Sequence, residues 1–213
     1  MVRFLVMGFP KIFRRLYFLR RFSSARIPTR VGEFTAHSYR NNFKNEGNIA
    51  LVLGDVTDID TPLVRVHSEC LTGDLIGSLR CDCGSQLQVS LEMIGEEGVG
   101  ILIYLRGHEG RGIGLGKKLR AYNLQDQGMD TVDANLEQGL PVDSRDYYFA
   151  AEILQDLGVS KIRLLTNNPK KKSELEDEGI DVVSRVPLEI APTEENKRYL
   201  ETKKTRLGHI LNN

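Results

Sequence analysis

The run Val99-Gly-Ile-Leu-Ile-Tyr-Leu105 is short and apolar, as expected of a strand buried inside a sheet. Residues 84–97, directly before it, place Leu87, Leu91 and Ile94 on one face of a predicted helix. The same alternation of element types continues in both directions along the chain. Further strands are predicted at 49–56, 63–68, 161–165 and 180–186, and further helices at 117–127, 145–157, 169–178 and 194–207. We therefore expect an α/β (α+β) fold in which a mixed sheet is flanked by helices.

Composition indicates an ordinary folded chain with an uneven charge distribution. Its 213 residues are 40% hydrophobic, which is enough for a sizeable core. The net charge of zero conceals an asymmetry: residues 1–30 carry eight Lys or Arg and no acidic residue, whereas residues 31–213 carry 21 basic and 29 acidic residues. An acidic body argues against a non-specific nucleic-acid binder, so any bound anion requires a local basic site.

The first 26 residues differ from the rest of the chain. Their apolar runs are interrupted by Arg3, Lys11 and two arginine pairs, which makes them too short and too charged for a membrane span. A basic, acid-free, partly amphipathic stretch is typical of an organelle transit peptide. A surface helix and the remnant of a linker are the alternatives. We assign 1–26 as a leader and 27–213 as one domain, with plastid or mitochondrial localisation if the leader is a transit peptide and cytoplasmic localisation otherwise.

All three cysteines, Cys70, Cys81 and Cys83, fall within 14 residues. In an intracellular protein, an odd and clustered set of thiols favours a metal site over disulfides. Three protein ligands leave one position of a tetrahedral zinc ion free for water, as hydrolytic chemistry requires. The spacing is not that of a standard zinc finger, so three unrelated reduced cysteines remain the alternative.

Two polar segments follow predicted strands. Residues 65–70 (Arg-Val-His-Ser-Glu-Cys) offer Arg and His to a phosphate and Glu69 to a base, unless they form only a charged outer face. Residues 106–116 contain five glycines, which allow backbone N–H groups to approach an anion. This segment matches neither the Walker A nor the dinucleotide-binding pattern. A phosphate role would therefore depend on Arg106, Arg111 and the loop geometry, and a structural loop is the alternative.

Two more polar segments precede predicted helices. In residues 140–146, Asp143 or Ser144 is expected to be a helix N-cap. Residues 165–172 (Leu-Thr-Asn-Asn-Pro-Lys-Lys-Lys) form a polar turn before a helix N-terminus that carries three lysines. Such a turn suits an anion, although a solvated charge run would look the same.

Taken together, these segments resemble one family, GTP cyclohydrolase II of riboflavin biosynthesis, over about residues 26–210. The resemblance rests on five motifs that occur in the family's order. They are Arg-Val-His-Ser-Glu-Cys-Leu-Thr-Gly-Asp, Leu-Arg-Cys-Asp-Cys-Gly, Glu-Gly-Arg-Gly-Ile-Gly-Leu, Leu-Arg-Ala-Tyr-Asn-Leu-Gln-Asp and Leu-Leu-Thr-Asn-Asn-Pro-Lys-Lys. The form Arg-Gly-His-Glu-Gly-Arg is similar to that of bifunctional proteins in which a dihydroxybutanone phosphate synthase precedes this domain. No such domain fits before Ile27, so the chain is expected to perform only the GTP reaction.

The resemblance implies a reaction, its cofactors and its partners. GTP and water would give formate, pyrophosphate and 2,5-diamino-6-ribosylamino-4(3H)-pyrimidinone 5′-phosphate, the first step of riboflavin biosynthesis. C8 of guanine is a weak electrophile, so the attacking water must become hydroxide-like, which a thiolate-held zinc achieves near neutral pH. By the match to the family, Cys70, Cys81 and Cys83 bind one zinc per chain together with water, and His67 is a substrate contact rather than a fourth ligand. Mg²⁺ on the GTP phosphates and a homodimer are implied as well, and neither a nucleic-acid partner nor a membrane span is.

The resemblance also assigns the substrate contacts, among which Glu109 suits the N1–H and 2-amino donors of guanine. The contacts are Arg65, Val66, His67, Ser68, Glu69, Gln86, Glu109, Gly110, Arg111, Thr131, Thr166 and Lys171. Three residues are assigned to catalysis. Tyr122 matches a tyrosine near the ring-opening chemistry, and Asp143 and Arg145 match a proposed proton acceptor and a proposed nucleophile that would form a guanylyl-enzyme. A guanidinium with a pKa above ~12 is a poor nucleophile, so stabilisation of phosphoryl charge is the rival role of Arg145.

Three other functions are compatible with parts of the sequence. A structural zinc module that binds protein or RNA would explain the cysteines but not Asp143, Arg145 or the glycine-rich loop. A catalytically silent relative that serves as a partner of a pathway enzyme would keep the same motifs. A different nucleotide hydrolase would use the same site. Loss of zinc without unfolding would favour the catalytic functions, because structural zinc usually supports the fold.

Overall fold

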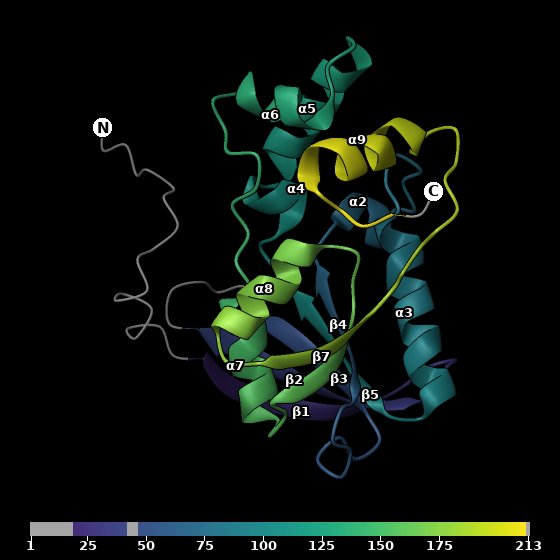
Figure 1. The fold of residues 1–213 in the computed structure, drawn as a ribbon, viewed down its shortest axis with the longest axis vertical. Helices are drawn as coiled ribbons and strands as arrows, with labels where there is room; N and C mark the ends of the chain where they lie inside the picture. Colours follow the sequence, from purple (N-terminus) through teal and green to yellow (C-terminus); the bar gives the residue numbers. More distant parts are fainter. Residues whose placement is uncertain (1–18, 42–46, 212–213) are drawn as a thin grey trace.

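The buried run at the centre of the sequence forms β5 (Gly100–Leu105), the middle strand of a seven-stranded mixed sheet (Figure 1). The structure is a computed structural model that describes residues 19–41 and 47–211. The other strands are β1 (Leu19–Pro28), β2 (Glu33–Asn41), β3 (Asn48–Leu53), β4 (Leu63–Ser68), β6 (Lys161–Leu165) and β7 (Asp181–Val186). The helices are α2 (Leu71–Asp74), α3 (Cys83–Glu97), α4 (Glu109–Gly112), α5 (Leu115–Asp126), α6 (Thr131–Leu136), α7 (Tyr148–Asp156), α8 (Pro169–Asp177) and α9 (Lys197–Leu207). The predicted fold class is confirmed.

The sheet combines an antiparallel half with a parallel half, in the order β1-β2-β3-β5-β4-β6-β7. β1, β2 and β3 form an antiparallel meander whose last strand pairs antiparallel with β5. β4 lies parallel between β5 and β6, with Val64 opposite Ile101 on one side and Leu164 on the other. β7 extends the parallel half beyond β6. The carboxyl ends of β4, β5 and β6 therefore meet at one edge of the sheet.

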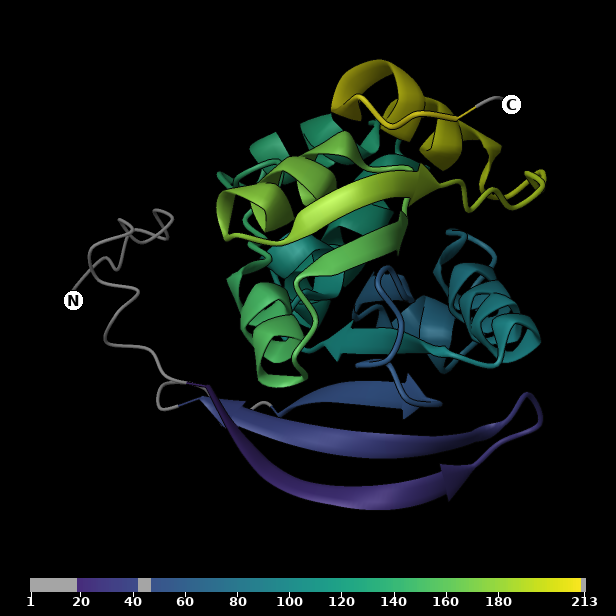
Figure 2. The same cartoon turned by 60° about the horizontal axis from the view of Figure 1, so that its bottom comes forward.

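Helices cover both faces of the sheet, and each face has its own apolar core (Figure 2). On one face, α7 packs Ile153 and Leu154 against strand residues such as Val66 and Ile103. On the other face, α3 contributes the fully buried Ile94, which packs with Leu102 of β5. β5 is apolar on both sides because both of its faces are covered, whereas β4 carries the buried Arg65 and His67 on one face.

The sequence prediction excluded residues 1–26 from the fold, and for residues 19–26 this was wrong. They lie in β1, which pairs with β2 along its whole length, and the Arg21 guanidinium forms an ion pair with Asp156 of α7 at 2.6 Å. β1 is exposed over nearly all its residues, so it has no alternation of apolar side chains that would reveal a strand. The remainder of the predicted leader, residues 1–18, lies outside the described part of the chain.

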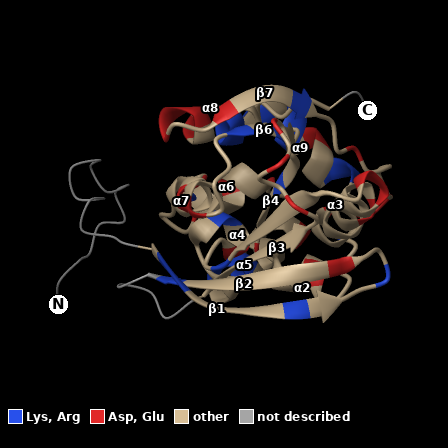
Figure 3. Ribbon diagram, turned by 90° about the horizontal axis from the view of Figure 1, so that it is seen from below, with Lys and Arg blue, Asp and Glu red and all other residues tan. Residues whose placement is uncertain are grey.

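Most other predicted elements occur within a few residues of their expected bounds, but the start of α7 is a correction. The predicted helix 145–157 begins only at Tyr148, so neither Asp143 nor Ser144 is its N-cap. Asp143 instead binds Arg145, and the Ser144 hydroxyl donates to the carbonyl of Arg111 at 3.0 Å. Figure 3 shows basic and acidic residues on helices and strands alike. None of the helices formed by the described residues is long and apolar enough to cross a membrane.

Replacing Leu164 of β6 by Ala should lower the free energy of unfolding by about 2–5 kcal/mol, because a fully buried side chain would be removed from a close-packed core. Val183 of β7 is 56% exposed, and Val183→Ala should change it by no more than about 0.5 kcal/mol. Urea denaturation followed by circular dichroism measures both values. Equal losses in the two variants would contradict the assignment of the core.

Candidate active site

The loops that follow β4, β5 and β6 converge at one edge of the sheet. In sheets with parallel strands, the crevice at the carboxyl ends of the strands is the usual place for a ligand. The loop after β4 carries Glu69 and Cys70, the loop after β5 carries the glycine-rich segment, and the loop after β6 leads into α8. Three of the four polar segments identified in the sequence thus begin at this edge.

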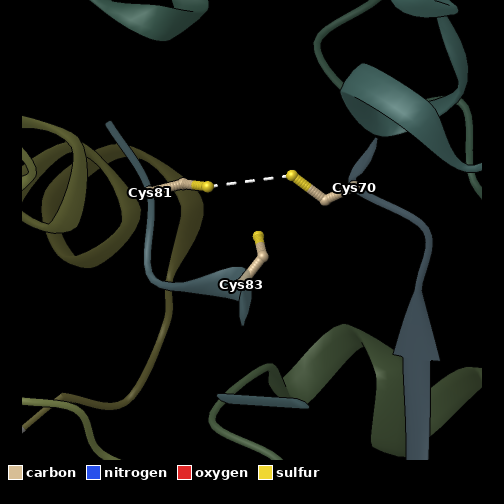
Figure 4. Close-up of side chains that lie close together, drawn as sticks. All are labelled: Cys70, Cys81 and Cys83. Atoms are coloured by element: carbon tan, nitrogen blue, oxygen red, sulfur yellow. Dashed lines mark hydrogen bonds between the residues drawn. The ribbon is translucent and has the colours of Figure 1, made fainter. Parts of the chain in front are cut away.

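The three cysteine sulfurs converge although they come from different elements (Figure 4). Cys70 directly precedes α2, Cys83 is the first residue of α3, and Cys81 lies in the turn before it. All three Sγ atoms lie within 4.8 Å of one another, and those of Cys70 and Cys81 are 3.7 Å apart. Two sulfurs on a tetrahedral zinc, each bound at about 2.3 Å, lie about 3.8 Å apart. The donor set and its spacing therefore fit a zinc ion.

Glycine is required where α2 meets the cysteine turn. A Cβ atom on Gly73 would lie 2.8 Å from the Cys81 sulfur and 3.2 Å from the Cys70 sulfur. A Cβ atom on Gly84 would lie 2.4 Å from the carbonyl oxygen of Gly73. Real Cβ atoms do not make such contacts, so the backbone itself forms one wall of the thiol site.

A buried lysine sits beside the thiol cluster. The Lys118 ammonium donates to the Cys70 sulfur at 3.1 Å, to the Thr72 hydroxyl at 2.8 Å and to a Glu109 carboxylate oxygen at 2.5 Å. Hydrogen bonds with Cys81 and with Cys83, and then the Lys118 ammonium, lower the pKa of Cys70. The surroundings of Cys70 thus favour the thiolate, which is the form that binds metal.

His67 lies outside the thiol cluster, as the sequence analysis expected. Its ring Nε2 hydrogen-bonds Asp74 at 3.0 Å, and its ring stacks on Tyr104. Burial lowers the pKa of His67, which keeps the ring neutral at neutral pH. Its Nδ1 and the Nε of Arg65 are buried atoms without a hydrogen-bond partner among the described residues.

Two cavities adjoin the cluster, and the first is strongly cationic. Its lining residues come from β4, from the loops after β5 and β6, from α3 and α8, from the segment before α7 and from the C-terminal segment. They are Arg65, His67, Ser68, Cys83, Gln86, Arg111, Arg145, Thr166, Asn167, Asn168, Lys171, Tyr199, Lys203 and His209. Five of these residues are Lys or Arg, and none of the described residues that line the cavity is Asp or Glu. Such a lining suits a polyanion.

The second cavity contains the thiols. Its lining residues are Ser68, Glu69, Cys70, Cys81, Cys83, His108, Gly110, Arg111, Ile113, Lys118, Ala121, Tyr122, Gln125, Thr131, Asn135, Arg145 and Tyr199. Five of them, Ser68, Cys83, Arg111, Arg145 and Tyr199, also line the first cavity. The two cavities are therefore neighbouring parts of one site.

Comparison with known proteins agrees with this geometry. The family model described as GTP cyclohydrolase II matches residues 20–187. The chain belongs to the GTP cyclohydrolase II family. The match begins within β1, which agrees with the place of this strand in the sheet.

Several proteins similar to this chain have names that refer to riboflavin biosynthesis. The chain is 59% identical over 192 residues to the bifunctional riboflavin biosynthesis protein RIBA 1, chloroplastic, of Arabidopsis thaliana, which covers 90% of this chain and 35% of that protein. It is 56% identical to the monofunctional riboflavin biosynthesis protein RIBA 3, chloroplastic, of the same plant, with 90% and 38% covered. It is 57% identical to the riboflavin biosynthesis protein RibBA of Salinispora tropica, with 89% and 47% covered. The chain thus spans between a third and a half of the length of these relatives.

Three residues predicted for the GTP cyclohydrolase II site do not line the cavities. Val66 is fully buried, and its carbonyl accepts a hydrogen bond from Lys171 at 2.6 Å. The Glu109 carboxylate is buried and bonded to Lys118 and to the backbone N–H of Leu71. In this structure it therefore lines neither cavity. Asp143 is hydrogen-bonded to Arg145, which lines both cavities.

Asp143 and Arg145 form a two-point ion pair. The Arg145 Nε donates to one carboxylate oxygen at 2.9 Å, and its terminal nitrogen donates to the other at 2.5 Å. Burial would raise the pKa of Asp143, but the guanidinium of Arg145 outweighs it and lowers that pKa to about 2. Although burial opposes it, Tyr147 and Asp143 raise the pKa of Arg145 above its usual value. The pair thus holds Arg145 as a cation at the junction of the cavities.

The glycine-rich loop does not present the open row of backbone donors that its sequence suggested. The backbone N–H groups of Arg106 and Gly107 donate to side chains, and those of Arg111, Gly112 and Gly114 donate to carbonyls of the same loop. Gly110 and Arg111 both have positive φ, at 59° and 66°, and this turn directs the Arg111 side chain into both cavities. Arg106 is half-exposed and lines neither cavity.

The predicted anion site after β6 is partly realised. Asn168 caps α8 by accepting the backbone N–H of Lys170, and the loop from Thr166 to Asn168 lines the cationic cavity. Of the three lysines, Lys171 is buried there, whereas Lys170 and Lys172 pair with glutamates on the outer face of α8. Burial, together with Arg65, lowers the pKa of Lys171.

Among the site residues that were not identified from the sequence are Lys118, Tyr199, Lys203 and His209. Lys118 lies in a helix rich in Lys and Arg, and α9 is charged along its length, so both helices resemble solvated surface helices. No local spacing distinguishes a buried lysine from its exposed neighbours.

Gly73→Ala should weaken zinc retention by on the order of 10-fold or more, because the added methyl group displaces the sulfurs from a common centre. Gly116→Ala is the matched control, since a Cβ atom there meets nothing within 4 Å. Zinc content after dialysis against a chelator, measured by atomic emission, gives the result. A fully loaded Gly73→Ala protein would contradict the thiol geometry described above.

Proposed function

We propose that this chain catalyses the zinc-dependent hydrolysis of GTP to formate, pyrophosphate and 2,5-diamino-6-ribosylamino-4(3H)-pyrimidinone 5′-phosphate, the first step of riboflavin biosynthesis. The observation that carries the proposal is the junction of a cationic cavity with a cavity that contains three thiols. A substrate that fills both cavities must place a polyanion in the cationic cavity and the group to be hydrolysed in the thiol cavity. GTP does so, because its triphosphate and its purine ring, which contains C8, are attached to different carbons of the ribose.

We place the triphosphate against Arg65, Arg145 and Lys171, and the guanine ring beside the thiols. Ser68, Arg111 and Tyr199 line both cavities, so they would contact the middle of the nucleotide. A bound substrate would also supply hydrogen-bond partners for two buried atoms that have none among the described residues, the Nε of Arg65 and the Nδ1 of His67.

We assign Cys70, Cys81 and Cys83 as the ligands of one zinc ion. A zinc ion held by three protein ligands keeps a fourth position for water and lowers the pKa of that water to near 7. The protein contributes the surroundings of this water. Tyr122 lines the thiol cavity beside Lys118, and burial raises its pKa, so its hydroxyl stays protonated and can donate a proton during ring opening.

For the α–β phosphoanhydride, we propose that Arg145 acts as a fixed cation rather than as a nucleophile. A nucleophilic guanidine would have to lose a proton to Asp143, but the structure favours the opposite distribution of charge. The low pKa of Asp143 makes it a weak base, and the raised pKa of Arg145 makes it a weaker acid than usual. Charge stabilisation of the transferring phosphoryl group needs only the cation and its position.

The remaining partners follow from the same proposal. Mg²⁺ would bind together with the phosphates and take their oxygens as ligands, since none of the described residues lining the cationic cavity is a carboxylate.

A homodimer would use the exposed edge strand β1, where Phe22 and Ile27 are 58% and 42% exposed. The chloroplastic names of the plant relatives support a plastid location, with a transit peptide that ends before β1 begins at Leu19.

The native chain, incubated with GTP, Zn²⁺ and Mg²⁺, should yield formate, pyrophosphate and the diaminopyrimidinone, detected by mass spectrometry. Cys83→Ser should abolish formate release, because only two of the three thiolate ligands remain. Pyrophosphate from this variant with an intact purine ring would restrict the role of zinc to C8. No product from the zinc-loaded native chain would contradict the proposed function and favour a catalytically silent relative.

Arg145→Lys should retain measurable pyrophosphate release, reduced by on the order of 10²- to 10³-fold, because an ammonium keeps the charge but not the two-point geometry. Arg145→Met removes the charge, so its pyrophosphate release should be slower than that of Arg145→Lys. Quenched-flow assays of pyrophosphate measure both variants. Complete loss in Arg145→Lys, together with a phosphoramidate trapped on the native chain, would establish the nucleophilic role instead.

A further inference from the structure

The C-terminal segment forms a wall of the site. Tyr199 and Lys203 of α9, and His209 after it, line the cationic cavity, and Tyr199 lines the thiol cavity as well. This segment lies beyond residue 187, where the family match ends. In Figure 1, α9 lies at the same end of the molecule as α2 and α4, which follow β4 and β5 at the carboxyl edge of the sheet.

Lys203 connects α9 to the cysteine turn. Its ammonium donates to Asp82 at 2.5 Å, and the exposed fractions of the two side chains are 9% and 3%. Asp82 stands between Cys81 and Cys83 in the sequence and precedes the first turn of α3. An ion pair this deeply buried fixes the position of both partners, because neither carboxylate nor ammonium has water as an alternative.

The connection continues from the cysteine turn into the cationic cavity. The second oxygen of Asp82 accepts a hydrogen bond from the Gln86 amide at 2.6 Å. The Gln86 carbonyl accepts one from Arg65 at 2.7 Å, and Arg65 also donates to the carbonyl of Leu165 at the end of β6. A continuous chain of polar contacts thus runs from α9 past the thiols to a cation of the proposed phosphate site.

Other contacts hold α9 at both of its sides. Arg206 pairs with Asp130, the N-cap of α6, and with Asp133 of this helix, whose first residue, Thr131, lines the thiol cavity. After α9, the backbone N–H of Ile210 donates to the carbonyl of Asn167, which belongs to the loop after β6. The segment is therefore docked on the site from two directions.

We propose that Lys203 is a positioning residue: through Asp82 it holds the Cys81–Cys83 turn in the geometry that binds metal, and through Gln86 it orients Arg65 toward the nucleotide. The inference rests on the proposed function for the identity of the nucleotide. Its first half, which concerns the metal, is independent of GTP. α9 is on this account part of the active site rather than a closing helix on the surface.

The test compares Lys203→Met and Lys203→Arg with Lys197→Met, an exposed lysine of the same helix, in the full chain. Zinc transfer to a chromophoric chelator reports retention of the metal, and the thiolate-to-metal absorption bands of the cobalt-substituted protein report its geometry. Binding of a non-hydrolysable GTP analogue and the KM for GTP report the nucleotide site. We expect Lys203→Met to release zinc on the order of 10-fold faster, with altered cobalt bands and weaker analogue binding. Lys203→Arg should be closer to the native chain than Lys203→Met in zinc release, cobalt bands and analogue binding. Lys197→Met should match the native chain in all three.

The inference is overturned if Lys203→Met lowers the melting temperature but leaves zinc release, cobalt bands and analogue binding as in the native chain. If Lys203→Met does not fold, the double variant Asp82→Asn/Lys203→Met removes both charges and leaves neither unpaired. It should also release zinc faster, and native-like release would overturn the inference. A native chain that retains zinc but neither binds the analogue nor converts GTP refutes the proposed function alone, because the zinc readout still decides the role of Lys203.

Discussion

The parallel pairing of β4 with β5 and with β6 is the constraint on which the site depends. β4 and β5 are buried on both faces, and β6 is buried at its carboxyl end. Packing therefore fixes the register of these strands, and their last residues lie at the same edge of the sheet. The loops that leave this edge bring together Cys70, Arg111 and Lys171, which are distant in sequence. The apolar core therefore does more than stabilise the fold: it sets the distance between the thiols and the cationic cavity.

At this edge of the sheet, the buried cations near the thiols are paired with carboxylates, whereas some of those in the cationic cavity are not. Beside the thiols, the buried Lys118 is matched by Glu109, and at the cysteine turn Lys203 is matched by Asp82. In the cationic cavity, the Lys171 ammonium donates to the carbonyl of Val66 and lies over the Tyr147 ring, and burial lowers its pKa. Burying a charge without a partner is unfavourable, so a cluster of unmatched cations indicates a ligand rather than a structural device.

The sequence predicted those parts of the molecule in which covalent chemistry or burial limits the choice of residue. Strands 63–68 and 161–165 were predicted at their observed bounds because apolar and polar residues alternate along most of each segment, as expected of a strand. The thiol cluster was predictable because no other side chain supplies the same ligand. β1 was missed because an exposed edge strand needs no apolar alternation. Lys203 was missed because it and Lys204 are adjacent and identical, and only the tertiary structure buries one and exposes the other.

The cationic cavity also bears on how the free chain and the liganded chain differ. Arg65, Arg145 and Lys171 repel one another in a buried space, and this repulsion opposes folding as long as no anion is present. A bound polyphosphate would reduce that repulsion and accept a hydrogen bond from the Arg65 Nε, which has no partner among the described residues. Part of the binding free energy therefore arises from the relief of an unfavourable arrangement that the core imposes. The unmatched cations lower the free energy of unfolding of the free chain. A ligand that binds only the folded chain raises this free energy again.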